Sequence, residues 1–385
     1  MDVFSHPRGR RWLAGAYLLV VLFATWQRGI LSHEHTTFAI FRQSYVHLVQ
    51  HTDLYAIYPA EHGAASQDIF KYSPTAAMLF APLSASPYAV ALFWWNLLNA
   101  GLLFWAVVRI LPSRQANVAL AMLLPEVFTT IQASSSNAFI AALMLFAMRW
   151  IAAGRHARAA AAIALGASIK IFPLAALGMA IVRRDRGRIA AFLALSVVVL
   201  LALPLTVVSL RDLIEQYRSW RMVQIADAGD IQFGMSLMRA LREFWEIALP
   251  NWAFQIAGTL LVLVPLLRRD QWNNETFQLR FCGSLLMFVV LFNHQAERQS
   301  LVIAATGCAV WLVTRPFSLP LAVCYGLALT GASVLPYALL WAVLQGDLLG
   351  DAPAMALALA RRRIAALREA SGFITGARTD APNAS

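Results

Sequence analysis

Five of the eight histidines of this chain and four of its carboxylates lie close together in residues 28–73. They are His33, His35, His47, His51 and His62, with Glu34, Asp53, Glu61 and Asp68. Histidine and carboxylate side chains are common proton donors and acceptors in enzymes, so this segment is a candidate for acid–base chemistry. His47 and His51 are four residues apart, as two metal ligands on one helical face would be. No His-Glu-x-x-His motif accompanies them, so we expect no metal site and no cofactor.

The chain contains only two lysines, Lys71 and Lys170, against 29 arginines. Lys170 lies in the apolar stretch 169–173, where a charge is costly and usually faces a cavity or a partner. Pro173 breaks the helix and frees backbone groups, which is tolerated where the backbone is buried in protein or lines water. A lysine beside a broken helix suits a phosphate group. The alternative is a lysine that extends its ammonium group to the membrane surface.

Two polar turns supply further donors and acceptors, at residues 132–137 and 293–298. The second reads Asn-His-Gln-Ala-Glu-Arg, with one non-polar residue in six. We expect the sugar or acceptor side of a site to be lined by His294, Glu297, Arg298, Tyr72 and Asn137. The alternative is that both segments are ordinary polar turns between helices.

The composition around these residues is that of a membrane protein. Hydrophobic residues make up 59% of the chain and charged residues 13%, about half the roughly 25% that is usual in soluble domains. Long apolar runs exclude the alternating segments of an outer-membrane barrel. The sequence therefore predicts an all-α, polytopic helical bundle embedded in the lipid bilayer. The net charge of +11 reflects arginines on the cytoplasmic side, so we expect no nucleic-acid partner.

About nine full membrane spans are predicted, since a span needs about 20 apolar residues. They are 12–30, 87–111, 115–131, 137–153, 189–210, 250–267, 277–293, 299–314 and 318–341. Segments 74–84 and 159–182 are short or interrupted, and we expect re-entrant half-helices there. We treat residues 1–350 as one transmembrane domain, followed by a basic helix and disordered tail in 351–385.

The positive-inside rule orients the bundle with its N-terminus in the cytoplasm. The long loops 28–73 and 211–249 then lie on the opposite, extracytoplasmic side. Both contain amphipathic helical patterns, in residues 36–50 and 236–249. In the first, Phe38, Phe41, Tyr45 and Leu48 share one face, with Arg42, Gln43 and His47 off it. We expect these helices to lie on the membrane surface or to cap a cavity. The alternative is that they only pack on the bundle.

The order and spacing of several motifs resemble glycosyltransferase family 87, membrane-embedded sugar transferases of the GT-C architecture. The resemblance covers roughly residues 10–315. It rests on Phe38-Ala39-Ile40-Phe41-Arg42-Gln43-Ser44, Asp53-Leu54-Tyr55, Tyr58-Pro59-Ala60-Glu61-His62, Phe70-Lys71-Tyr72-Ser73-Pro74-Thr75, Ala81-Pro82-Leu83, Trp95-Asn96, Leu98-Asn99, Ser136-Asn137, Ile169-Lys170-Ile171-Phe172-Pro173-Leu174, Tyr217-Arg218-Ser219-Trp220 and Phe292-Asn293-His294-Gln295-Ala296-Glu297.

The resemblance implies a metal-independent hexosyltransferase or pentosyltransferase, with mannose as the expected hexose. Such an enzyme moves the sugar from a polyprenyl-phosphate donor to a glycan or glycolipid acceptor on the extracytoplasmic face of a bacterial inner membrane, in the course of cell-envelope assembly. Lys170, Lys71 and Arg42 would hold the donor phosphate, since cations stabilise a leaving phosphate. A carboxylate of the first outer loop would serve as the base for the acceptor hydroxyl.

The chain departs from the family pattern at Thr37. Many members carry an aspartate at this position, and a threonine cannot act as the base. We rank Glu61 and Asp68 first as replacements, then Asp53 and Glu34, with His62 polarising neighbouring groups. Asp53 also suits a turn or helix cap.

Two other functions fit the same pattern. A lipid or sugar transporter or flippase also uses broken helices and intramembrane charges, although no inverted repeat is visible. The missing aspartate is also compatible with a non-catalytic descendant that assists polysaccharide assembly in the envelope.

Overall fold

The computed structural model describes residues 7–32, 36–62, 68–227, 234–247 and 249–350 of the 385-residue chain. Within these residues the regular elements are all helices, without a strand, which confirms the all-α prediction. The α-helices are α1 (Pro7–Trp26), α2 (Thr36–Val49), α3 (Pro59–His62), α4 (Pro74–Ala77), α5 (Ala81–Ser84), α6 (Tyr88–Ile110), α7 (Ser113–Gln132), α8 (Asn137–Ala152), α9 (His156–Ile169), α10 (Arg186–Ala202), α11 (Leu210–Asp227), α12 (Leu237–Trp245), α13 (Asn251–Leu263), α14 (Glu275–Leu291), α15 (Leu301–Leu312), α16 (Leu319–Leu329) and α17 (Leu335–Leu349). Glu34 and the segment 351–385 lie outside the described residues.

Eight of the nine predicted spans correspond to one α-helix each, in several cases extended by a short 3₁₀ or π turn. Among the described helical segments, three are long and apolar enough to cross a bilayer by themselves: Arg8–Leu31, Tyr88–Ile110 and Arg186–Thr206. Shorter apolar helices accompany them at Asn137–Ala152, Asn251–Leu267, Leu319–Leu329 and Leu335–Leu349. The number of nine full spans stays a prediction.

The prediction of one span over residues 318–341 is wrong. The structure divides this segment between α16 and α17, which pack against each other. Gly331 connects them with a φ of +65°, a left-handed conformation that glycine adopts without a steric penalty. Pro336 stands in the first turn of α17, where its missing N–H costs nothing. Because residues 318–341 are mostly apolar, their composition does not reveal this turn.

The two segments expected to be irregular are irregular. Residues 74–84 form α4, the 3₁₀ turn η2 (Met78–Phe80) and α5 in succession. Helix α9 ends at Ile169, Lys170 is extended with φ −138° and ψ 142°, and the 3₁₀ helix η3 (Phe172–Ala180) follows. Pro173 packs over Gly166, where an added Cβ would lie 2.5 Å from the proline ring. The proline therefore both breaks the helix and fixes the path of the chain after Lys170.

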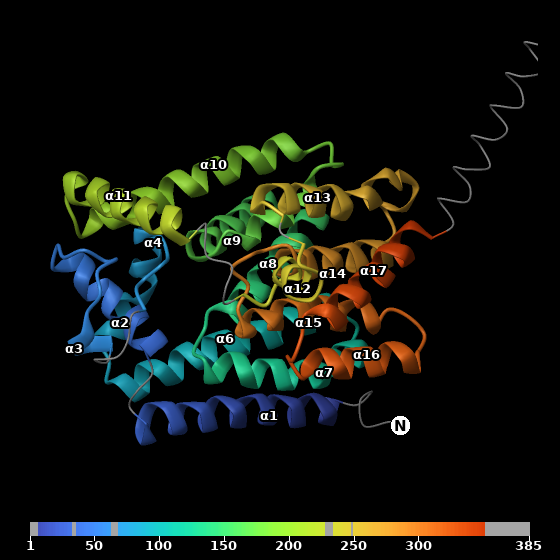
Figure 1. Cartoon of the computed structure of the whole chain (residues 1–385), viewed down its shortest axis with the longest axis horizontal. Coiled ribbons are helices and arrows are strands. Elements are labelled where there is room, and N and C mark those ends of the chain that lie inside the picture. The colour runs from blue at the N-terminus through green and yellow to red at the C-terminus, as the bar shows by residue number, and fades with distance from the viewer. Residues whose placement is uncertain (1–6, 33–35, 63–67, 228–233, 248, 351–385) are drawn as a thin grey trace, which may run out of the picture.

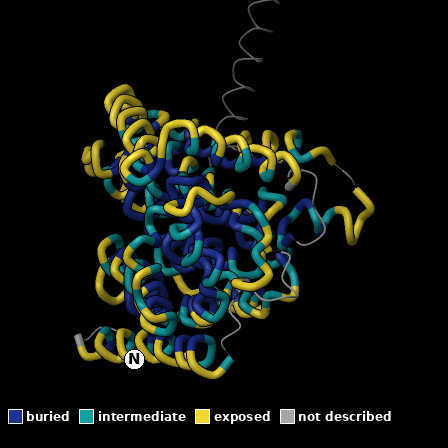
Figure 2. Tube along the Cα trace, turned by 90° about the vertical axis from the view of Figure 1, so that its left-hand side faces the viewer, coloured by how far each residue is buried: buried dark blue, intermediate teal, exposed yellow. Residues whose placement is uncertain are grey.

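The core of the bundle consists of α8, α14 and α15, in each of which most residues are buried. Gly283 of α14 and Gly307 of α15 face each other closely, and a Cβ on either one would clash with the opposite backbone carbonyl. Around this core, α1 and α10 lie at opposite edges (Figure 1) and expose apolar side chains such as Leu195 and Val198. Figure 2 shows the same division, with buried chain at the centre and exposed chain outside. Exposed apolar helix faces suit contact with lipid.

Helices α2, α3, α4 and α11 gather at one end of the molecule, away from the N-terminal end of α1 (Figure 1). The loop after α2 bonds directly to α11: Gln216 Oε1 accepts from the Leu54 N–H at 3.1 Å, and Gln216 Nε2 donates to the Thr52 carbonyl at 2.8 Å. His51 Nδ1 lies 2.9 Å from an Asp212 carboxylate oxygen. Segments 28–73 and 211–249, predicted to share one side, thus contact each other.

The two amphipathic helices differ from prediction in detail. In α2, Phe38, Phe41 and Leu48 are buried as expected, but His47 is buried as well, because its ring stacks on Tyr58 with centroids 3.8 Å apart. The second helix is shorter than expected, since α12 ends at Trp245.

Helix α12 also exposes part of its apolar stripe. Phe244 and Trp245 are exposed, whereas Ala240 is buried. Ala248 lies outside the described residues.

Candidate active site

The Phe70–Pro74 motif is held from several sides. The Phe70 side chain is buried at 1% exposure. The Tyr55 hydroxyl donates to the Tyr72 carbonyl at 2.9 Å. The Ser73 hydroxyl donates to the Ser168 carbonyl, in the last turn of α9, at 2.6 Å. These bonds attach the end of the first long loop to the helix that precedes Lys170.

Lys71 is fixed through its backbone, while its side chain is exposed. Its carbonyl accepts from Trp220 Nε1 at 3.0 Å and from Gln224 Nε2 at 3.1 Å. Both donors belong to α11, one turn apart on the same face. Helix α11 therefore determines where the Lys71 ammonium group can reach.

The turn before α8 has an unusual backbone that α6 supports. Ser134 has a φ of +50°, which is uncommon for a residue with a side chain. Its carbonyl accepts from Trp95 Nε1 at 2.8 Å. Asn99 Oδ1 accepts from the Phe139 N–H at 3.0 Å, which satisfies one of the free N–H groups of the first turn of α8. The turn thereby presents Ser136 and Asn137 in a defined orientation.

Lys170 points at this turn. Its ammonium Nζ donates to Asn137 Oδ1 at 3.0 Å, and the Asn137 amide in turn donates to Ser135 Oγ at 3.2 Å. Lys170 also lies over the Phe172 ring, 5.8 Å from its centroid. Lys170 is partly buried, and Asn137 and Phe172 are neutral. Neither of these contacts therefore neutralises the positive charge of the ammonium group.

The Tyr72 hydroxyl completes a group that we call the Lys170 cluster: Lys170, Asn137, Ser136 and Tyr72. Tyr72 Oη lies 3.1 Å from Ser136 Oγ. Burial raises the pKa of Tyr72, the charge of Lys170 and the Ser136 bond lower it, and the charge of Glu297 raises it. The net shift is upward, so the hydroxyl keeps its proton at neutral pH and can donate to an anion.

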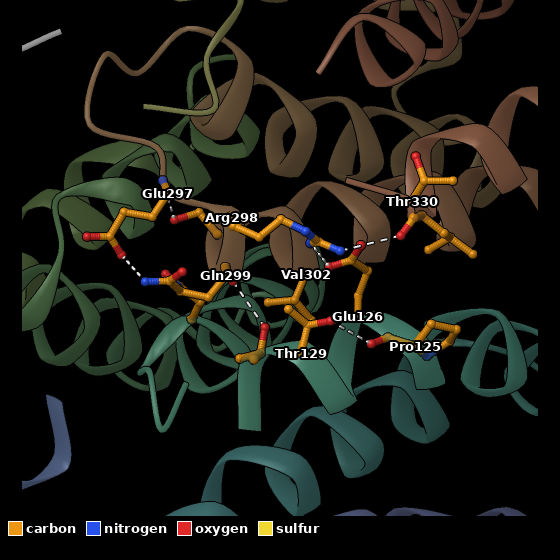
Figure 3. A network of polar contacts seen from close by, with 12 residues as sticks. Pro125, Glu126, Thr129, Glu297, Arg298, Gln299, Val302 and Thr330 are labelled. Carbon is orange, nitrogen blue, oxygen red and sulfur yellow. Dashed lines mark hydrogen bonds and ion pairs between the residues drawn. The ribbon is translucent and has the colours of Figure 1, made fainter. Parts of the chain in front are cut away.

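Glu297 is linked to the Lys170 cluster by a chain of hydrogen bonds through the α7–α8 turn. The Ser135 N–H donates to the Thr130 carbonyl at 3.3 Å, and the Thr130 hydroxyl donates to the Gln299 carbonyl at 3.1 Å. Gln299 Nε2 donates to the Glu297 carboxylate. In Figure 3 the Glu297 side chain points away from Arg298, on the other side of the 297–299 turn.

Two of the predicted cations have other partners. Arg42 donates to the carbonyls of Ser84 and Ser86, at 3.1 and 2.9 Å, and so closes the end of α5. Arg298 pairs with Glu126 of α7 at 2.7 Å (Figure 3). These bonds give both arginines a structural role in the bundle.

The predicted acids of the first loop that the structure describes lie in three different surroundings. Glu61 bonds to His47 Nε2 at 2.8 Å, which ties α3 to α2. Asp53 Oδ1 accepts from the Tyr55 N–H at 3.0 Å, as in an Asx turn. Asp68 is exposed, two residues before Phe70.

The remaining histidine candidates add little to the cluster. His294 is partly buried, with Nδ1 3.5 Å from Gln255 Nε2. Glu34 and the side chain of His62 lie outside the described residues.

Of the predicted residues, the structure therefore brings together Lys170, Asn137 and Tyr72, with the charges of Lys71 and Glu297 acting on the same hydroxyl. Sequence reasoning named Ser136 only as part of a motif and not as a site residue, although its position beside Asn137 was the available indication. It also left out Gln224, whose spacing from Trp220 on one helix face was the available indication.

The ammonium group of Lys170, the amide of Asn137 and the hydroxyls of Ser136 and Tyr72 form a set of donors suited to a phosphate oxygen. Among the residues that the structure describes, no three histidine, cysteine or acidic side chains lie close enough to hold a metal.

A model of glycosyltransferase family 87 matches residues 70–292, more than half of the 385-residue chain. The match includes the Phe70–Pro74 motif, the turn before α8 and Lys170. No curated protein matches the chain at a significant level.

Proposed function

The chain belongs to glycosyltransferase family 87, and from this premise we propose that it transfers a sugar from a polyprenyl-phosphate donor to an acceptor hydroxyl. The family and the apolar helices make it a membrane glycosyltransferase. Mannose or a pentose is the proposed sugar, and a glycan or glycolipid is the proposed acceptor. We place the protein in a bacterial inner membrane with the site on the extracytoplasmic face.

The single observation that carries this proposal is the Lys170 Nζ–Asn137 Oδ1 contact beside the Tyr72 hydroxyl. A polyprenyl phosphate leaves as an anion, and its charge grows as the bond to the sugar breaks. A preorganised cation and hydroxyl donors stabilise that developing charge. The same groups suit a donor phosphate whose lipid tail extends along the apolar outer helices, and no metal is required by this chemistry.

The proposed side of the membrane follows from the position of the Lys170 cluster. The Phe70–Pro74 motif bonds to α11 and to the loop after α2, in the two segments that the arginine distribution assigns to the extracytoplasmic side. An extracytoplasmic site agrees with the proposed lipid-linked donor, whose apolar tail is held in the membrane.

The test is sugar transfer by purified protein in proteoliposomes. The donors are short-chain polyprenyl phosphates that carry labelled mannose or labelled arabinose, and octyl mannoside is the acceptor probe. We expect labelled product from one donor, and a large loss of product in Lys170→Met. Label released from neither donor, to the acceptor or to water, would overturn the proposal. Accumulation of intact labelled donor inside sealed vesicles, without transfer, would instead indicate transport.

A further inference from the structure

We propose that Glu297 is the general base that activates the acceptor hydroxyl, and that the buried Glu126–Arg298 ion pair positions it. The inference rests on the proposed function, because it names the base for that same sugar transfer. Glu297 thereby takes the role that the sequence analysis assigned to an acid of the first loop.

The first argument is the placement of the carboxylates. Glu61 is bonded to a buried histidine and Asp53 to a backbone N–H of its own turn. Glu297 is exposed and is connected through Gln299 and Thr130 to the turn that presents Ser136 and Asn137. Its charge also acts on the Tyr72 hydroxyl. Glu297 therefore lies beside the proposed phosphate site while its carboxylate can still be reached by an acceptor.

The second argument is the anchor that follows it in the chain. The Arg298 guanidinium contacts Glu126 at 2.7 Å, and the Glu126 side chain is completely buried in α7. Arg298 also donates to the Leu329 carbonyl at 3.4 Å. The side chains of these adjacent residues thus point in opposite directions, Arg298 toward Glu126 and Glu297 away from it (Figure 3). A buried ion pair is a strong constraint, because separating its partners strands a charge in an apolar environment.

The 297–299 turn is also braced locally. The Glu297 N–H donates to Ser300 Oγ at 3.3 Å, and the Ser300 N–H donates back to the Glu297 carbonyl at 2.9 Å. This reciprocal pair begins the 3₁₀ turn η7 (Arg298–Ser300) that leads into α15. The base is therefore carried by a turn that is fixed at both ends, as precise proton transfer requires.

In the proposed step, the Glu297 carboxylate takes the proton of the acceptor hydroxyl as the acceptor oxygen attacks the anomeric carbon. A new carbon–oxygen bond forms there, and the bond from that carbon to the phosphate oxygen breaks. The electron pair of the broken bond stays on the polyprenyl phosphate, where Lys170 and Tyr72 stabilise it. Glu297 ends protonated and returns its proton to water.

The experiment compares Glu297→Gln with wild type in the proteoliposome assay with the labelled donor and octyl mannoside. General base catalysis contributes about 10²- to 10⁴-fold, so we expect kcat to fall by that factor while polyprenyl-phosphate binding stays within about threefold. The acidic limb of the kcat–pH profile should disappear in the variant. Glu215→Gln is the matched control, since Glu215 is an exposed, arginine-paired glutamate on α11, and it should retain wild-type kcat.

The positioning role is tested with Arg298→Met. We expect kcat to fall about tenfold or more with donor KM unchanged, because a small displacement of the base weakens proton transfer. Arg315→Met is the control for a purely structural effect, since it removes another partly buried ion pair, Arg315–Asp347 at 2.9 Å, which joins the segment after α15 to α17. It should lower thermal stability without changing kcat. Equal kcat losses in both variants would overturn the positioning role.

The base assignment is overturned if Glu297→Gln keeps kcat within threefold of wild type, or keeps the acidic limb, while Lys170→Met is inactive; the proposed function then stands. It is equally overturned if Glu61→Gln or Asp68→Asn produces the loss instead. If wild type releases no label from either donor, the proposed function fails and the base assignment fails with it.

Discussion

Replacement of Lys170 by methionine is the perturbation that addresses the site most directly. Methionine keeps a similar chain length but carries no charge and no donor. The Lys170 backbone is extended between α9 and η3, so the change need not disturb a helix. Asn137 loses one bond at 3.0 Å and keeps its bond to Ser135.

The size of the effect follows from the kind of bond that is lost. A hydrogen bond to a charged group contributes about 1.5 to 3 kcal/mol, which corresponds to roughly 10- to 150-fold in affinity. We therefore expect polyprenyl phosphate, without sugar, to bind Lys170→Met about 10- to 150-fold more weakly. Lys170→Arg should recover part of the affinity, since it keeps the charge but not the compact geometry of the ammonium group.

The assay is displacement of a fluorescent polyprenyl phosphate from protein in nanodiscs, at two salt concentrations. Arg211→Met is the matched control, because it also removes one positive charge. Arg211 is an exposed cation on α11. It should change affinity less than twofold, since exposed charges are screened. Binding by Lys170→Met within twofold of wild type would refute the assignment of the phosphate to the Lys170 cluster.

Three further predictions concern stability. Arg298→Met should destabilise the fold by about 3 to 5 kcal/mol, because it leaves the buried Glu126 carboxylate unpaired. Glu126→Leu combined with Arg298→Leu should recover most of the lost stability. Thermal unfolding in detergent measures both variants, and an Arg298→Met protein as stable as wild type would contradict the burial argument. Gly307→Val should lower the unfolding temperature, since overpacking typically costs about 1 to 3 kcal/mol and its Cβ would clash with the Gly283 carbonyl; unchanged stability would mean that α14 and α15 are farther apart. Burial raises the pKa of Tyr72 above 10.0, so the contribution of Tyr72 to stability is complete below pH 10 and declines as pH rises further. Unfolding midpoints measured from pH 8 to 11 should therefore fall more steeply in wild type than in Tyr72→Phe. Equal slopes would contradict the raised pKa.

The class of the protein and the location of most helices could be predicted from the amino-acid sequence. Long apolar runs with few charges are typical of the helices of a membrane protein, and eight of the nine predicted spans coincide with single helices. The break after Ile169 was also predictable, because Pro173 cannot continue the helix. The turn at Gly331 was not, since a short polar interruption in an apolar run does not distinguish one bent span from two helices.

The composition of the site depended on tertiary structure. Lys170 meets Asn137, 33 residues away in the chain, only because α9 packs on α8. Arg42 was predicted from the sequence to bind the donor phosphate and Arg298 to line the sugar or acceptor, yet each contacts a carbonyl or carboxylate contributed by another part of the chain. Spacing along the chain reports which residues share a helix face. It does not report which helix lies opposite, and in a bundle the opposite helix decides whether a charge is a structural partner or is left to bind a substrate.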